Sequence, residues 1–371
     1  MNTSFQEHLI RRNIYKSAMH SESGLNFSSN NDEYDYVLPC IYEHVDNFGS
    51  IFMPCIYYFV FIVGLIGNIL VITVYIFFQK LKDLTDIYLV NLAVADTLFV
   101  FTLPFWAKTA AHEWIFGTIM CKVVRSLYAI NLYSCMLTLT CITLDRFSAI
   151  VLATKCHGQH TKKMVFGKVL CVCIWLSALV LGTPELIFSK VANHTKSTCE
   201  MEFYNNQIVA KTAKGIQLLI GFIIPLLSMI VCYSVIVKTL ISAKGFQKYK
   251  SIKIILAIVI SFVVLQLPYN ITSIIQSLRT DDDLYYELCD TKLARKYAII
   301  ITEAVAYIHC CLNPILYAFL GQKFKKTFRK ILKHYGMISH KQLPEQNKTE
   351  TETSKTFSAI YTADVTSMYQ L

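Results

Sequence analysis

A single carboxylate lies in the middle of an apolar stretch of this 371-residue sequence. Asp96 follows Leu92-Ala93-Val94-Ala95. A charge there costs about 2.5–3.5 kcal/mol on membrane-insertion scales, so it needs polar partners. Asn68 and Asn313, each in another apolar stretch, are the candidate partners. A buried cluster of these three residues either holds the helices together as a purely structural contact or repacks when the helices move.

An acid and a base stand side by side at the end of a further apolar stretch. Asp145 and Arg146 precede Phe147, and such an ion pair can form in one conformation and break in another. The pattern therefore indicates a switch rather than catalysis. We find no His-Glu-x-x-His, Gly-x-Ser-x-Gly or phosphate-binding loop in the sequence, which predicts no enzyme and no cofactor.

Seven apolar blocks of membrane-spanning length must position these residues. The chain is 54% hydrophobic and 16% charged, whereas soluble domains carry about 25% charged residues. A helix needs roughly 20 apolar residues to cross a bilayer. We therefore expect an all-α membrane protein, a seven-transmembrane helix bundle. The blocks lie near 54–78, 87–107, 120–144, 165–188, 216–242, 252–278 and 297–320.

Five prolines interrupt five of these blocks, and a proline inside a helix frees a carbonyl and bends the helix. Five kinks in five spans suit a bundle that opens at one end. The prolines are Pro104, Pro184, Pro225, Pro268 and Pro314.

The segments on either side of the bundle have patterns of their own. Residues 1–50 hold no apolar run and are expected to form an extracellular arm, so the first span of the 51–321 bundle directs insertion. In 322–335, basic and apolar residues alternate at helical spacing, which predicts an amphipathic eighth helix on the lipids of the inner membrane surface. Residues 336–371 would form a cytoplasmic tail.

Basic residues gather on one side of this topology, in 80–82, 155–168, 244–253 and 323–333. Positive loops face the cytoplasm, so we expect a multi-pass plasma-membrane protein with its N-terminus outside and its C-terminus inside. The net charge of +10 then reflects topology and not nucleic-acid binding. Acidic residues on the outer side favour a basic ligand, or simply reflect avoidance of positive charge there.

Four cysteines fall on the expected outer side, where disulfides persist, and four cysteines permit three pairings. They are Cys40, Cys121, Cys199 and Cys289. Three Asn-x-Ser/Thr sequons on the same side predict glycosylation. These are at Asn2, Asn26 and Asn193.

Taken in order, several of these features resemble the rhodopsin-like, G-protein-coupled receptor superfamily from about residue 40 to 335. Two further segments, Thr102–Trp106 and His112–Gly117, resemble the chemokine receptors within it. The superfamily markers are Gly67-Asn68, Asp96, Cys121, Asp145-Arg146-Phe147, Trp175, Pro225, Tyr233, Pro268 and Asn313-Pro314-Ile315-Leu316-Tyr317.

The resemblance implies an extracellular chemokine as ligand, an inhibitory-class heterotrimeric G protein and arrestin as partners, and the disulfides Cys121–Cys199 and Cys40–Cys289. It implies that Trp106 and Glu303 meet the ligand inside the bundle. It also implies a sodium ion beside Asp96, although Cys135 and Cys310 replace serines of relatives. Activation and coupling would use Asp145, Arg146, Tyr233, Asn313, Pro314 and Tyr317.

Two departures narrow the resemblance. Gln266 stands where most relatives have a tryptophan, and Phe147 where they have a tyrosine. Both residues are similar to a CXC-type receptor, which implies a CXC chemokine. The alternative is a scavenging receptor of the same fold, without G-protein signalling. Such receptors usually lack an intact Asp-Arg pair at this position, whereas Asp145-Arg146 is intact here.

The arm and the tail carry the remaining candidate sites. The acidic arm Asp32-Glu33-Tyr34-Asp35-Tyr36 would capture a basic chemokine, with an acidic context that suits tyrosine sulfation; otherwise it is a solvated arm. In the tail, phosphorylation would create an anionic strip for arrestin, unless the tail is merely polar. The tail sites are Thr349, Thr351, Thr353, Ser354, Thr356 and Ser358.

Overall fold

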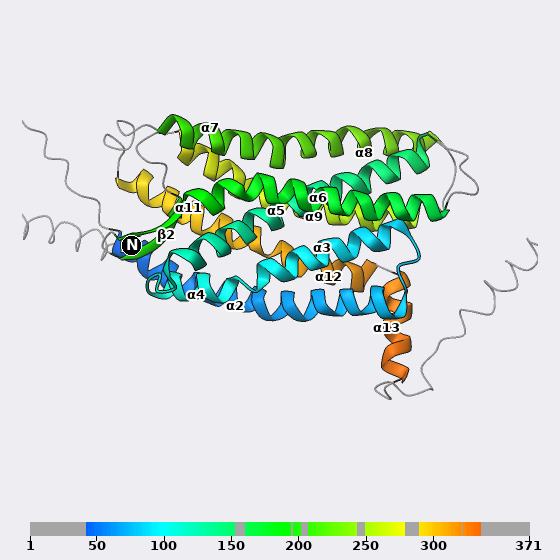
Figure 1. The fold of residues 1–371 in the computed structure, drawn as a ribbon, viewed down its shortest axis with the longest axis horizontal. Coiled ribbons are helices and arrows are strands. Elements are labelled where there is room, and N and C mark those ends of the chain that lie inside the picture. The colour runs from blue at the N-terminus through cyan, green and yellow to red at the C-terminus, as the bar shows by residue number, and fades with distance from the viewer. Residues whose placement is uncertain are drawn as a thin grey trace, which may run out of the picture. The chain divides into compact units, whose positions relative to one another are not determined.

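The structure is a computed structural model that describes residues 42–152, 160–193, 196–201, 207–242, 249–278, 289–320 and 322–334. Within these residues, seven helical spans are long and apolar enough to cross a membrane, which confirms the predicted bundle. They run side by side along the long axis of the molecule (Figure 1).

Most spans extend past the apolar blocks, and α2 begins at Glu43, inside the range expected for the arm. The first four spans are α2 (Glu43–Thr73) with η1 (Val74–Phe78), α3 (Leu84–Val100) with α4 (Leu103–Ala111), α5 (Gly117–Ile150) and α6 (His160–Phe188). The last three are α7 (Gln207–Leu218) with η2 (Leu219–Ile223) and α8 (Ile224–Ser242), then α9 (Tyr249–Leu278), then α11 (Cys289–Tyr307) with α12 (His309–Leu320). The predicted eighth helix is α13 (Gln322–His334).

Two of the five predicted prolines, Pro104 and Pro225, lie next to irregular helix. The other three, Pro184, Pro268 and Pro314, lie inside the α-helices α6, α9 and α12. The helix is interrupted between α3 and α4, just before Pro104. At this interruption Thr102 Oγ1 donates a hydrogen bond to the Phe99 carbonyl. The π-helical turn η2 lies just before Pro225, so the regular α-helical hydrogen bonding of this span is interrupted there. Pro54, inside α2, is a further proline that the sequence analysis did not single out.

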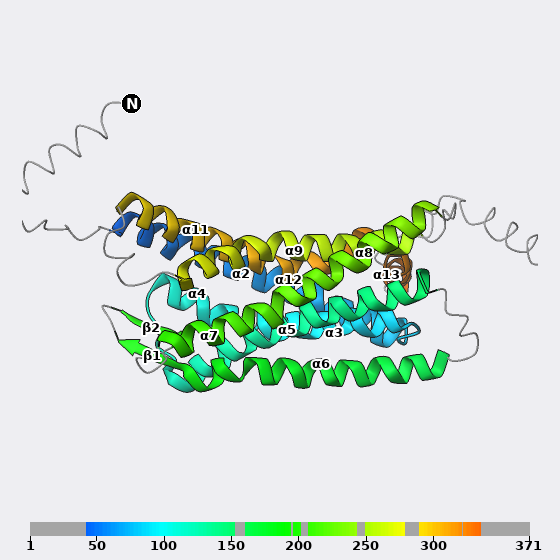
Figure 2. The same ribbon diagram turned by 90° about the horizontal axis from the view of Figure 1, so that it is seen from above.

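A β-hairpin covers one end of the bundle, and the sequence analysis did not predict it (Figure 2). Strands β1 (Ser189–Asn193) and β2 (Ser197–Met201) pair antiparallel. The disulfide Cys121–Cys199 ties β2 to α5, with the two Cα atoms 5.6 Å apart. The backbone N–H of Trp114 also donates to the Ser197 carbonyl at 2.8 Å, so the hairpin is held on two sides.

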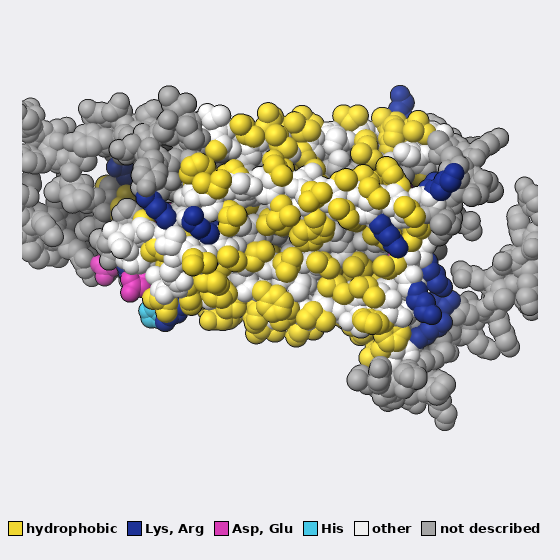
Figure 3. All heavy atoms as spheres, in the orientation of Figure 1, with side chains coloured by type: hydrophobic (Ala, Val, Ile, Leu, Met, Phe, Trp, Pro, Cys, Tyr) yellow, Lys and Arg dark blue, Asp and Glu magenta, His cyan; other side chains and the backbone are white. Residues whose placement is uncertain are grey.

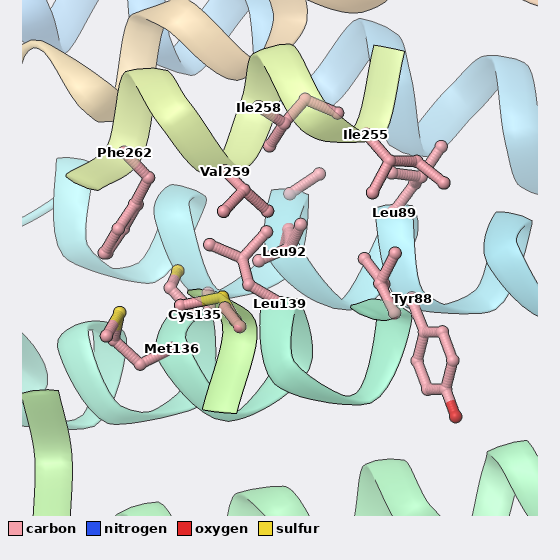
Figure 4. Packing of buried hydrophobic residues seen from close by; sticks show 14 of the residues in the cluster. Tyr88, Leu89, Leu92, Cys135, Met136, Leu139, Ile255, Ile258, Val259 and Phe262 are labelled. Atoms are coloured by element: carbon pink, nitrogen blue, oxygen red, sulfur yellow. The ribbon is translucent and has the colours of Figure 1, made fainter. Parts of the chain in front are cut away.

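The largest apolar cluster lies between α3, α5 and α9. Figure 4 shows Val259 and Phe262 of α9 facing Leu92 of α3 and Leu139 and Met136 of α5. In contrast, the flank of the bundle carries exposed apolar side chains, with charged residues toward its two ends (Figure 3). On α6, for example, Phe166 and Val180 are 61% and 71% exposed, as expected for a surface that faces lipid.

Helices α2 and α12 approach closely at Gly67. A Cβ atom at this position would lie 2.8 Å from both Cβ and Cγ of Pro314, and the proline ring cannot rotate away. The Gly67-Asn68 and Asn313-Pro314 pairs therefore form one contact between the first and the last span.

We predict that Gly67→Ala lowers the melting temperature of the purified receptor by several degrees, because overpacking typically costs about 1–3 kcal/mol. Gly215→Ala is the matched control, since nothing lies within 4 Å of a Cβ placed at Gly215. Thermal unfolding with a thiol-reactive dye measures both variants. Equal melting temperatures would contradict the close packing of α2 on α12.

Candidate functional site

A cavity of about 260 Å³ opens among the spans below the hairpin. Its lining includes Trp106 from α4, Tyr128 from α5, Tyr269 from α9 and Glu303 from α11. The structure thus brings the two residues predicted inside the bundle, Trp106 and Glu303, into one cavity. The indole Nε1 of Trp106 is buried and has no hydrogen-bond partner within the described ranges, which leaves it a donor for a ligand.

Two phenols hold the carboxylate of Glu303. Its Oε1 atom accepts from the hydroxyl of Tyr307 at 2.9 Å and from that of Tyr57 at 3.3 Å. Within the described residues, both of these hydrogen bonds end on the same carboxylate oxygen. Glu303 is therefore oriented, and its other oxygen is the atom that can accept from a ligand.

A buried ion pair on the cavity wall was missed by the sequence analysis. Arg125 Nε lies 2.8 Å from Glu185 Oε2, and Arg125 Nη1 reaches the Cys199 carbonyl at 3.5 Å. A charge inside an apolar span was the signal, because such charges face the bundle interior. With Glu303, the wall carries two carboxylates and one cation, so a basic group in the cavity is favoured.

The hairpin forms a roof over this region. Cys121 and Cys199 are packed with Trp114 and Val124 in a small apolar cluster. Cys289 is also disulfide-bonded; its predicted partner Cys40 lies outside the described residues, so that pairing stays a prediction. Asn193, the predicted glycan acceptor, is exposed at the end of β1 and accepts from Ser197 Oγ at 3.0 Å.

Asp96 is fully buried and has several polar partners. Asn313 Nδ2 donates to its Oδ2 at 2.9 Å, and Asn131 Nδ2 donates to its Oδ1 at 3.0 Å. The Cys135 thiol lies 3.6 Å from the same Oδ1. Asn68, the other predicted partner, instead donates to the backbone carbonyls of Gly64 and Cys310, each at 2.9 Å.

Gln266 and His309 extend this cluster to α9. His309 Nε2 lies 3.7 Å from Asp96 Oδ1, and its Nδ1 lies 3.1 Å from Gln266 Nε2. Gln266 is only 1% exposed, and its Nε2 also lies 3.4 Å from the Ala306 carbonyl. We call Asp96, Asn131, Asn313, His309 and Gln266 the polar core; it joins α3, α5, α9 and α12.

Asp96, Cys135 and His309 could together hold a metal ion, since their ligand atoms lie within 4.8 Å of one another. Carboxylate and carbonyl oxygens suit hard cations, whereas thiols and imidazoles suit softer ones. The donor set therefore fits sodium less well than an all-oxygen set would. The sodium ion beside Asp96 stays a prediction.

At the opposite end of the bundle, the predicted switch residues are in contact. Arg146 Nε lies 3.7 Å from Asp145 Oδ2, and its guanidinium also donates to Thr85 Oγ1 on α3. Tyr233 is buried on α8. Tyr317 belongs to α12, but its side chain is outside the described part of the chain.

Several predicted sites lie outside the described residues. They are the acidic arm 32–36, the sequons at Asn2 and Asn26, Cys40, and the tail residues from Thr349 to Ser358.

Comparisons with known proteins agree with this geometry. Residues 67–317 match the family model described as 7 transmembrane receptor (rhodopsin family). C-C chemokine receptor type 7 from Homo sapiens is 38% identical over 347 residues, covering 90% of this chain and 92% of the relative. The chain belongs to the chemokine receptors of the rhodopsin family.

Two other relatives support the same assignment. C-C chemokine receptor type 9 from Mus musculus is 40% identical over 307 residues, covering 82% of this receptor and 83% of the relative. C-C chemokine receptor type 6 from Mus musculus is 38% identical over 308 residues, with the same coverage. The family and the seven spans make the receptor a multi-pass plasma-membrane protein, and the family consists of receptors rather than enzymes.

We predict that Arg125→Leu destabilises the receptor more than Arg125→Leu with Glu185→Leu does. Removing one partner of a buried pair typically costs about 3–5 kcal/mol, whereas replacing both partners by apolar residues is often neutral. The side chain of Glu185 is 6% exposed, so its charge would remain buried and unpaired. Melting temperatures of the purified variants measure this; a double variant no more stable than the single one would contradict it.

Proposed function

We propose that this receptor binds an extracellular chemokine and signals through an inhibitory-class G protein to calcium mobilisation and chemotaxis. The observation that carries the proposal is the roofed cavity in which Trp106 and Glu303 meet. The chemokine receptors that resemble this chain over more than four fifths of its length support the same ligand class. A calcium or cAMP response of expressing cells to a panel of chemokines tests it.

The ligand would be held by two contacts. A folded chemokine is too large for a cavity of 260 Å³, so only a flexible end can enter it. The acidic arm 32–36 would hold the basic body of the chemokine at the surface. A cationic group of the inserted end would reach the oriented carboxylate of Glu303.

The chemokine class is inferred from sequence resemblance. Five features of the sequence are similar to the CXC chemokine receptor type six. They are Gln266, Phe147, Gly245–Lys248, Ser354–Ala359 and Thr366–Leu371. We therefore infer a CXC ligand, the membrane-tethered CXC chemokine numbered sixteen. The C-C receptors found as relatives support the chemokine family as a whole, so a panel that contains both C-C and CXC chemokines decides between the classes.

The polar core would carry the signal across the membrane. Tyr307, whose hydroxyl donates a hydrogen bond to Glu303, lies two residues before His309 on the last span. His309 contacts both Asp96 and Gln266, so movement near Glu303 changes the packing of α9. In this receptor Gln266 would thus replace the aromatic switch of its relatives with a polar contact.

At the expected cytoplasmic end, Arg146 would change partners on activation. Its contacts with Asp145 and Thr85 would hold it in the resting arrangement. Their loss would free the guanidinium for the G protein, beside Tyr233 and Tyr317. Phosphorylation of the tail between Thr349 and Ser358 would then recruit arrestin.

The alternative is a scavenging receptor that internalises a chemokine without a G protein. The intact Asp145–Arg146 contact favours the signalling receptor. Internalisation with no calcium or cAMP response to any chemokine would favour the scavenger.

We predict that Arg146→Ala abolishes chemokine-stimulated calcium flux while chemokine binding stays within about threefold of wild type. The reason is that Arg146 lies at the opposite end of the spans from the cavity. Surface expression is matched by antibody staining. Unchanged calcium flux at equal expression would contradict the proposed coupling role.

We predict that Tyr34→Phe with Tyr36→Phe slows association and weakens its salt dependence, because sulfate groups on these tyrosines would add surface charge, which acts on the association rate. Exposed charges are screened over about 8 Å at physiological salt, and a carboxylate inside the bundle is screened less. Glu303→Gln should therefore reduce signalling more than binding. Surface plasmon resonance across a salt series, with a calcium assay, separates the two. Equal proportional losses in both assays at every salt concentration would refute the two-contact division.

A further inference from the structure

A second hollow lies at the other end of the molecule, between α13 and the turn that follows the first span. Its volume is about 590 Å³, within the range of small-molecule sites of about 300–1,000 Å³. It is far along the bundle from the cavity of Glu303, and the signalling role described above does not use it. The lining residues are Phe78, Gln79, Lys82, Asp86, Lys326, Thr327, Lys330 and Ile331.

The charge of this hollow favours an anion. Lys82 comes from the turn and Lys326 and Lys330 come from α13, so two separate elements direct cations at one space. Asp86 contributes the one negative charge of the lining, but its Oδ2 accepts from the backbone N–H of Asp83 at 3.1 Å. Three cations and one carboxylate leave a net charge of +2. Figure 3 shows Lys and Arg side chains gathered at this end of the bundle.

Gln79 supplies a hydrogen-bond donor without a partner. Gln79 is 8% exposed, and its buried Nε2 atom has no hydrogen-bond partner among the residues that the structure describes. A buried donor left unpaired costs about 1–3 kcal/mol. An acceptor oxygen of a ligand in the hollow would remove this cost.

The backbone around Gln79 is held in an unusual conformation. The next two residues, Lys80 and Leu81, have φ values of +58° and +46°, which side-chain-bearing residues rarely adopt. The Leu81 N–H donates to the Tyr75 carbonyl at 3.2 Å, and the Gln79 N–H donates to that of Val74 at 3.0 Å. This tight turn places Gln79 and Lys82 on the same hollow, and strained backbone of this kind clusters at ligand sites.

The edge of the hollow is apolar. Phe78 is 44% exposed and lines it, and Phe77 beside it is 70% exposed on the outer surface of the first span. On the other side, Phe324 and Phe328 stack with ring centroids 6.0 Å apart and anchor α13 against the bundle. A ligand that fits has an anionic head for the lysines and an apolar tail for the phenylalanines.

We propose that this hollow binds the headgroup of a polyphosphorylated inositol lipid of the inner leaflet. Lysine binds phosphate as a point charge, and basic pockets beside membrane spans on the cytoplasmic side accept such headgroups. The predicted orientation puts α13 at that leaflet. The phosphates lie among Lys82, Lys326 and Lys330, Gln79 Nε2 donates to one oxygen, and the acyl chains run along Phe77 and Phe78.

The proposal can be tested by titrating the purified full-length receptor, in neutral micelles, with a phosphatidylinositol bisphosphate labelled on its acyl chain. Fluorescence anisotropy gives the dissociation constant. Lys82→Ala with Lys326→Ala and Lys330→Ala should weaken binding roughly 100-fold, at about 1 kcal/mol per lysine. Gln79→Leu should weaken it about tenfold without lowering the melting temperature, because Gln79 Nε2 has no partner to lose within the described part of the chain.

The matched control removes three basic residues from the same end of the molecule that do not line the hollow. It combines Lys325→Ala, Arg329→Ala and Lys168→Ala, and should change the dissociation constant less than about threefold, because only general surface charge is lost.

Three results would overturn the proposal. The first is lipid binding by the control variant that is weakened as much as binding by the lining variant, which would show that the lipid responds to non-specific surface charge. The second is phosphatidylserine bound as tightly as the bisphosphate lipid. The third is a soluble inositol bisphosphate bound as tightly as the lipid, which would make the occupant a soluble polyphosphate.

Discussion

A carboxylate buried in a bundle of apolar helices must find partners, and the rest of this receptor is arranged around that requirement. Asp96 has no exposure, and its two oxygens take donors from Asn131 on α5 and Asn313 on α12. His309 and Gln266 extend the cluster to α9. Because an unpaired buried charge is so costly, these helices cannot separate at this level without exchanging partners.

This constraint connects the two ends of the molecule. Glu303 and its partner Tyr307 lie on α11, and His309 begins α12 directly after a break in the same span. At the other end, Thr85 on α3 accepts from Arg146, eleven residues before Asp96 on the same helix. A ligand that moves the last span would thus act on a cluster that also positions α3 and α9. The apolar cluster of Figure 4 packs α9 against α3 and α5 just beyond it.

The sequence predicted what depends on long apolar blocks and on isolated polar residues within them. Seven spans, the eighth helix, the Asp96–Asn313 contact and the Asp145–Arg146 contact all follow from such patterns. Other features depend on which helix faces meet, which periodicity alone does not give. Asn131 and His309 were missed because the first is an ordinary polar residue and the second can equally be a packed core histidine. The hairpin was missed because its strands are only five residues long and lack clear alternation.

The most direct test of the central claim is a double-mutant cycle on Gln266 and His309, measured as nucleotide exchange on a purified G protein with and without chemokine. Gln266→Leu and His309→Phe each remove one partner of the contact between α9 and α12. If the polar core holds the resting bundle together, each variant raises exchange without ligand, and the double variant raises it no further. Strictly additive effects, with a coupling energy below about 0.5 kcal/mol, would show that the two residues do not act together.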